Sequence, residues 1–150
     1  RDHLRILSGL YGLLRPLDEI EPYRLEMGSR LPTNRGRNLY DFWGKELSIE
    51  LNKIAMKTDA RFLLNCASKE YFSAIDMQHL DLKVVTPVFL ENADSKPKIV
   101  SFYAKKARGA MARFVMQNKI MAIEDLKLFD AGGYAYQADL SDEQTLYFVR

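Results

Sequence analysis

The amino-acid sequence predicts an α+β protein in which a mixed β-sheet is flanked by helices. Stretches of strand length that are rich in β-branched and aromatic residues alternate with stretches whose apolar residues recur every three or four positions. Strand–helix–strand segments occur beside hairpin-like pairs of strands, which is typical of a mixed sheet. At 150 residues and 47% apolar composition, the chain can bury the core of one domain. We therefore expect a single domain over residues 1–150.

The first predicted element is a short buried strand within residues 4–14, which are apolar but interrupted by Gly9 and Gly12. Glycines at this spacing favour a strand that passes into a tight turn over a helix. Two prolines fix the backbone of the loop that follows, residues 15–28. Stiff polar loops often line binding sites, and this one carries Arg15, Asp18, Tyr23, Arg24 and Glu26.

The clearest helical pattern covers residues 38–56, with Asn38 as its N-cap. Its apolar positions are Leu39, Tyr40, Trp43, Leu47, Leu51 and Ile54. A buried strand is predicted at 60–67, and Ser68 is placed to cap a short helix that runs to Ile75.

Residues 84–90 and 99–103 have strand-like composition, and the turn-forming segment 92–95 between them predicts a hairpin. Residues 104–118 have helical periodicity. A connector at 119–123 and a small helix at 124–129 follow, and two more strands are predicted at 134–138 and 145–149.

The two helices on either side of the connector form a candidate helix-hairpin-helix, a unit that binds duplex phosphates through backbone amides. Such hairpins usually carry glycines in the turn, and this connector contains none, so the sequence alone favours an ordinary packed helical turn.

Charge is distributed unevenly along the chain, although the net charge is only +2. Residues 96–119 contain seven Lys and Arg and no acid, and the rest of the chain is net −5. At about 100° per residue, the bases of the predicted helix lie opposite its apolar residues. This pattern predicts a phosphate-binding surface at a strand-to-helix junction, although a solvated helix face has the same composition. The bases concerned are Lys105, Lys106, Arg108, Arg113 and Lys119.

Gly109 lies within this predicted helix, where glycine costs on the order of 1 kcal/mol relative to alanine. Close approach of a ligand or another backbone would explain it, and so would tight core packing.

A second candidate site is a polar cleft where the predicted strand 60–67 ends and the next helix begins. Glu26 and Glu70 could act there as acid and base, but no spacing rule ties them together. The alternative is a helix cap beside a salt bridge. The cleft residues that we expect are Arg15, Asp18, Tyr23, Arg24, Asn65, Ser68 and Tyr71.

Several protein classes are disfavoured. There is no uninterrupted apolar run of about 18 residues and no signal peptide, so we expect no membrane partner. The glycine pattern matches neither a Walker loop nor a dinucleotide fingerprint. His3, His79 and Cys66 lack ligand spacing, so neither a metal site nor a cofactor is predicted. The lone cysteine fits a reducing compartment, and we expect a cytoplasmic protein.

Several sequence strings resemble the YaaA family closely. They begin with ILSGLYGLLRPLD at 6–18 and PYRLEMG at 22–28, and the resemblance covers essentially the whole chain. Further matches, in the family's order, are LYDFWG at 39–44, NCASKEYF at 65–72, PVFL at 87–90 and SFYAKKARG at 101–109.

The resemblance implies a cytosolic protein of the hydrogen peroxide response that helps to keep intracellular iron low. It further implies binding of double-stranded DNA, with little sequence preference, through a basic cleft and a helix-hairpin-helix. On this sequence the basic region falls on residues 105–113, the hairpin near 119–133 and the polar loop on residues 15–26. An enzyme acting on a nucleotide or damaged base in the same cleft is the alternative. A third interpretation, an iron-binding protein, is disfavoured because the sequence offers no set of iron ligands.

The chain opens at Arg1, without an initiator methionine, and enters an apolar run almost at once. An N-terminal segment with a Ser-Pro-Ala-Lys-Thr motif, expected in the family, is absent, and Cys66 stands where leucine is usual. We therefore expect the C-terminal portion of a longer protein.

Overall fold

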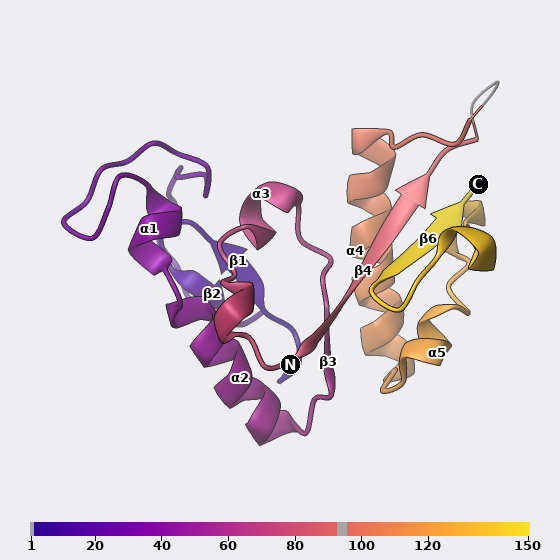
Figure 1. The fold of residues 1–150 in the computed structure, drawn as a ribbon, viewed down its shortest axis with the longest axis horizontal. Helices are drawn as coiled ribbons and strands as arrows, with labels where there is room; N and C mark the ends of the chain where they lie inside the picture. Colours follow the sequence, from indigo (N-terminus) through magenta and orange to yellow (C-terminus); the bar gives the residue numbers. More distant parts are fainter. Residues whose placement is uncertain (1, 93–95) are drawn as a thin grey trace. The chain divides into compact units, whose positions relative to one another are not determined.

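The computed structural model describes residues 2–92 and 96–150, and the chain folds into two compact units. Unit 1 comprises Arg1–Ala60 and Ala67–Leu82, and unit 2 comprises Arg61–Cys66 and Lys83–Arg150. Helices accompany a mixed four-stranded sheet, so the predicted α+β class is confirmed (Figure 1). The single domain stays a prediction.

Unit 1 begins with a β-hairpin rather than the predicted single strand and turn. Strand β1 (Ile6–Ser8) pairs antiparallel with β2 (Gly12–Leu14). Gly12 has φ +74°, and a Cβ there would lie 2.8 Å from the Trp43 ring. Gly12 therefore begins the second strand of the hairpin, because only glycine fits this close to the indole ring.

The predicted helix 38–56 is two helices, α1 (Leu39–Trp43) and α2 (Glu46–Thr58). The predicted N-cap is confirmed, since the Asn38 side chain accepts a hydrogen bond from the Asp41 amide at 2.9 Å. The prediction of one continuous helix is wrong, because Gly44, at φ 48° and ψ −126°, interrupts the helical backbone. The apolar repeat continues across the break, and this masked it in the sequence.

The buried apolar side chains of unit 1 come from the polar loop, both helices and the segment 74–75. Ser68 caps α3 (Lys69–Phe72) as predicted, accepting from the Tyr71 amide at 3.4 Å. A single 3-10 turn, Met77–His79, follows. The apolar core of this unit includes Met27, Leu39, Leu47, Leu51, Ala55, Ala74 and Ile75.

Unit 2 contains the mixed sheet, in the order β3-β4-β6-β5. Strands β3 (Phe62–Leu64), β4 (Lys83–Leu90) and β6 (Thr145–Val149) are parallel, and β5 (Ala135–Tyr136) pairs antiparallel with β6. Every second residue of β4 is buried, so one face of the strand meets the core.

Helix α4 (Ser101–Asn118) runs along β4 and buries Ala107 and Met111 against the sheet (Figure 1). The core cluster is completed by Val85, Phe89, Leu126, Phe129, Tyr134, Leu146 and Phe148. No helix in the described part of the chain is long and apolar enough to cross a membrane.

The predicted strand 99–103 is wrong, because Ser101–Tyr103 form the first turn of α4. Only one isolated bridge, between Glu91 and Lys98, joins this segment to the chain that follows β4. Residues 101–103 are exposed, so the strand propensity of their aromatic side chains is not supported by burial in a sheet, and they continue the helix instead. Residues 93–95 of the predicted turn lie outside the described residues.

Helix α4 ends at Lys119, which has φ 51° and donates its amide to the Val115 carbonyl. After a short connector comes α5 (Ile123–Leu126), a single helical turn. A helix-hairpin-helix is not shown by this geometry and stays a prediction. Two 3-10 turns, Ala131–Gly133 and Ala138–Leu140, complete unit 2.

Candidate functional site

The predicted basic residues lie on helix α4, and most of them face solvent. Lys105, Lys106 and Arg113 are exposed, whereas Arg108 is half-buried and donates Nε to the Ala104 carbonyl at 3.3 Å. Lys119 is exposed at the end of the helix. Within the described residues, none of these five side chains takes part in an ion pair. Their charge is therefore available to an external anion.

Two aromatic rings lie beside these bases in the first turn of α4. The Phe102 residue is 62% exposed and Tyr103 is 43% exposed. The Lys106 Nζ lies 4.4 Å from the centre of the Phe102 ring, within cation–π range. The start of the helix thus presents apolar rings and positive charge together.

The first turn of α4 is fastened to the sheet by a network that the sequence analysis did not find. The Arg150 guanidinium lies 4.6 Å from the Tyr103 ring centre and 4.8 Å from that of Tyr134. Its Nε is 2.8 Å from Glu91 Oε2, and the Tyr134 hydroxyl donates to the other carboxylate oxygen. The partners are far apart in the sequence and no local spacing connects them, so no sequence signal could have found this network.

The network sets the ionisation of its members. Burial alone would raise the pKa of Glu91, but hydrogen bonds from Tyr134 and Arg150 outweigh burial and lower the pKa. The pKa of Tyr134 is raised to about 12 by burial and by its bond to the Glu91 carboxylate. The carboxylate is therefore held ionised and the phenol neutral.

Unit 2 carries the cationic excess of the chain. It contains eleven Lys and Arg against eight Asp and Glu, a net charge of +3, whereas unit 1 has eleven against twelve, a net charge of −1. The unit that contains α4 is therefore the one that attracts anions at long range.

In unit 1, Arg15 and Asp18 of the polar loop bind each other. Arg15 Nη2 lies 2.7 Å from Asp18 Oδ1, and the Arg15 amide donates to Oδ2 at 2.7 Å. Hydrogen bonds from the Arg15 side chain and backbone lower the pKa of Asp18. Arg24 makes only an exposed contact with Glu26 at 3.4 Å.

Four of the predicted cleft and catalytic residues come together in unit 1. Burial raises the pKa of Tyr71, and the neighbouring Tyr23, Glu70 and Glu26 raise it further, although a hydrogen bond from the Met27 backbone lowers it. One carboxylate oxygen of Glu70 accepts from the Gly28 amide at 2.9 Å. The tyrosines and carboxylates therefore form one interacting group.

Two more predicted cleft residues have local structural partners. Ser68 caps α3 in unit 1, which is the alternative that the sequence left open for it. Asn65 belongs to unit 2. Its backbone amide donates to the Val85 carbonyl at 2.8 Å, and its side-chain Nδ2 donates to Thr86 Oγ1 at 3.4 Å.

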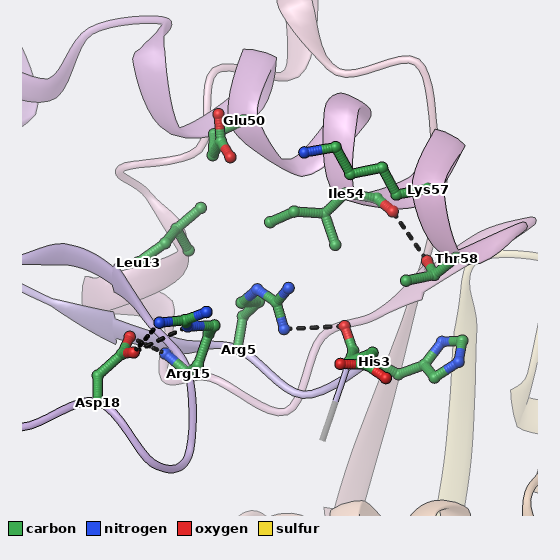
Figure 2. Close-up of a pocket in the computed structure, with 10 residues that line it drawn as sticks. His3, Arg5, Leu13, Arg15, Asp18, Glu50, Ile54, Lys57 and Thr58 are labelled. Carbon is green, nitrogen blue, oxygen red and sulfur yellow. Dashed lines mark hydrogen bonds and ion pairs between the residues drawn. The ribbon is translucent and has the colours of Figure 1, made fainter.

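Unit 1 also contains a cavity of about 560 Å³ that sequence reasoning missed (Figure 2). Arg5 and Arg15 lie near Asp18 on one side, and Glu50 and Lys57 of α2 lie on the other. Lys and Arg are as numerous in its wall as Asp and Glu, so the wall selects no sign of charge. The lining residues are Asp2, His3, Arg5, Leu13, Arg15, Asp18, Glu50, Ile54, Lys57 and Thr58.

The two histidines and the cysteine do not converge. His79 Nδ1 lies 2.7 Å from Asp76 Oδ2, His3 lies at the cavity, and Cys66 adjoins the core of unit 2. Burial raises the pKa of the Cys66 thiol to about 12, with a smaller opposing effect from Arg108. Over residues 2–92 and 96–150, no group of three or more His, Cys, Asp or Glu is placed to hold a metal ion.

The chain is similar to curated UPF0246 proteins of several bacteria. A UPF0246 protein of Dinoroseobacter shibae is 59% identical over all 150 residues of this chain, which cover 56% of that relative. UPF0246 proteins of Ruegeria pomeroyi and a Jannaschia species are each 57% identical over the whole chain, covering 59% and 58% of their lengths. The chain thus spans 56–59% of the length of these curated relatives.

A family model covers both the basic helix and the polar loop. The profile described as "Peroxide stress protein YaaA" matches residues 1–140, which include β1 to α5 and every site residue predicted from the sequence. The chain therefore belongs to the YaaA family of peroxide stress proteins.

Proposed function

We propose that this chain binds double-stranded DNA, with little sequence preference, through the exposed cationic face of α4. The observation that carries the proposal is a helix of 18 residues that has four bases, no acid and no ion pair to those bases within the described residues. Such charges contact phosphates, which are the same in every sequence. Family membership supports a role in peroxide stress, and a contribution to limiting intracellular iron and oxidative damage to DNA is part of the proposal.

The spacing of the bases suits a DNA backbone. Lys105 and Arg113 are eight residues apart in α4, or about 12 Å along the helix axis. Phosphates of one strand rise by about 3.4 Å each along the duplex axis, so a helix lying along that axis would present this face to roughly three to four phosphates. Contacts of this number produce binding that weakens steeply with salt.

The segment 119–133, where the family resemblance places a helix-hairpin-helix, contributes less to the proposal. Glu124 and Asp125 occupy the first turn of α5 and are exposed. Two carboxylates at that helix terminus repel phosphate, so the proposal depends on α4 and on Lys119 at its end.

The test is fluorescence anisotropy with a short labelled duplex over a salt series. The variant Lys105→Glu/Lys106→Glu/Arg113→Glu reverses the three exposed bases of α4, and we expect it to lose salt-dependent binding. The matched control, Arg30→Glu/Lys45→Glu/Lys69→Glu, makes the same change in net charge on exposed residues of unit 1. Equal losses in both variants, or no binding by the unaltered chain, would contradict the proposal.

A second candidate function is an enzyme that acts on a nucleotide or modified base. The observation that favours it is the group of Tyr23, Glu26, Glu70 and Tyr71 in unit 1, with the raised pKa of Tyr71. Glu26 is exposed and its contact with Arg24 is long, at 3.4 Å, whereas Glu70 accepts a hydrogen bond from the Gly28 amide, so Glu26 is the freer acid–base candidate. Under this hypothesis Glu26→Gln lowers the survival of peroxide-treated cells without changing DNA affinity. Unchanged survival with both Glu26→Gln and Glu70→Gln would remove the candidate.

A further inference from the structure

The helix α4 contains a glycine that packing does not explain. Gly109 is exposed in the middle of the helix, and a Cβ built on it has no heavy atom within 4 Å among the described residues. Its backbone is helical, not one of the positive-φ glycines. Tight core packing, one of the two explanations open from the sequence, is therefore not what holds glycine at this position.

The neighbours of Gly109 on the helix surface are the proposed DNA-binding bases. Residues three and four apart share a face, so Lys105 and Lys106 lie one turn before Gly109 and Arg113 lies one turn after it. Phe102, two turns before, lies on the same exposed side. The backbone of α4 is thus uncovered at Gly109, between the long side chains of Lys105, Lys106 and Arg113.

We propose that Gly109 is the point at which a sugar–phosphate backbone comes closest to α4. This inference rests on the proposed function and adds the contact geometry to it. With no Cβ at Gly109, the strand can lie against the helix backbone while Lys105, Lys106 and Arg113 reach phosphates on either side of it. A methyl group at that position would hold the strand away and lengthen all three contacts.

The proposal predicts that stability and affinity change in opposite directions. Gly109→Ala removes an unfavourable helix residue and meets no neighbour, so the midpoint of thermal unfolding rises by roughly 2–8 °C. The same variant binds duplex DNA about fivefold more weakly, and Gly109→Leu binds more weakly still. A purely structural glycine would not separate the two measurements in this way.

The experiment measures thermal unfolding and duplex affinity on the same preparations of the 150-residue chain. Asn118→Leu is the control, since it adds the same side chain to an exposed position on the side of α4 opposite Gly109, and it should leave affinity within about twofold. The charge reversal on Lys105, Lys106 and Arg113 is measured in parallel.

The outcomes separate the two proposals. If the charge reversal abolishes binding but Gly109→Ala and Gly109→Leu bind as the unaltered chain does, DNA binding stands and close approach at Gly109 is overturned. A lower unfolding midpoint for Gly109→Ala also overturns it, because the glycine would then serve the fold. If the charge reversal leaves binding unchanged, the proposed function itself fails.

Discussion

At the scale of single residues, Glu91 and Cys66 show how burial acts on two acids with different partners. Glu91 is mostly buried but receives hydrogen bonds from Tyr134 and Arg150, so its pKa is lowered. Cys66 is partly buried and has only a weak electrostatic benefit from Arg108, so its pKa is raised. The presence of donors decides which ionisation state the fold favours.

Glu91→Gln should destabilise the chain by about 1–2 kcal/mol at neutral pH, because two hydrogen bonds to a carboxylate are weakened. The pKa of Glu91 is lower in the folded chain than its ordinary value of 4.5. The contribution is therefore fully present above that ordinary value and is lost as the pH falls through the lowered pKa. Urea unfolding of both proteins at several pH values is the measurement. A difference that stays constant down to strongly acidic pH would contradict the network.

Cys66 should react slowly while the chain is folded. The thiolate is the reactive form, and raising the pKa from 9.0 to about 12 reduces its fraction at pH 8 by roughly two to three orders of magnitude. Iodoacetamide labelling followed by mass spectrometry should therefore be far slower in buffer than in urea. Equal rates in the two conditions would show that the thiol is not held neutral, and Cys66→Ser provides the unlabelled control.

At the scale of elements, the sequence predicted those features that depend on local chemistry. The caps at Asn38 and Ser68, the strand β4 and the helix α4 were all predictable, because each depends on a cap, a repeat or a composition within a few residues. The break at Gly44 and the helical start at Ser101 were not predicted, since the apolar repeat runs across the first and the aromatic residues of the second favour a strand.

The candidate sites likewise divide into those visible in the sequence and those that only the tertiary structure forms. A run of bases without acids is visible in the sequence and identified the cationic face of α4. The pairing of Arg150 with Glu91 links residues 59 positions apart, and the cavity wall joins the first residues of the chain to α2. Such pairings follow from tertiary structure and have no local pattern.

The hairpin β1–β2 should not tolerate a side chain at Gly12. Alanine there would combine a positive φ with overlap on the rigid Trp43 ring, at a cost of about 2–4 kcal/mol. Urea unfolding followed by the fluorescence of Trp43, the only tryptophan, measures this directly. Gly109→Ala is the matched control, because the same substitution meets no neighbour within the described part of the chain. Equal effects at the two glycines would contradict this account of the hairpin.

At the scale of the whole molecule, charge is divided between the units. Unit 2 is net +3 and contains the cationic helix, whereas unit 1 is net −1 and contains the cavity and the group around Tyr71. The two proposed functions, binding of a polyanion and chemistry on a small molecule, therefore involve different units of the chain.

The proposed DNA contact should have a defined salt dependence. If the four bases of α4 contact phosphates, the logarithm of the association constant falls against the logarithm of salt concentration with a slope of about −3 to −4. Replacing Lys106 by glutamine should make the slope shallower by about one. Lys45→Gln, in unit 1, should leave it unchanged. A slope that does not respond to Lys106→Gln would remove this residue from the contact.

The order in which the chain visits the two units limits how the protein can be dissected. Strand β3, the outer strand of the sheet in unit 2, lies between two segments of unit 1. A truncation that keeps only residues 83–150 therefore removes β3, one of the two parallel partners of β4, and leaves β4 as an exposed edge of the sheet. Loss of DNA binding on such deletion would report a damaged sheet, so point substitutions, not shortened fragments, are the means of mapping this protein.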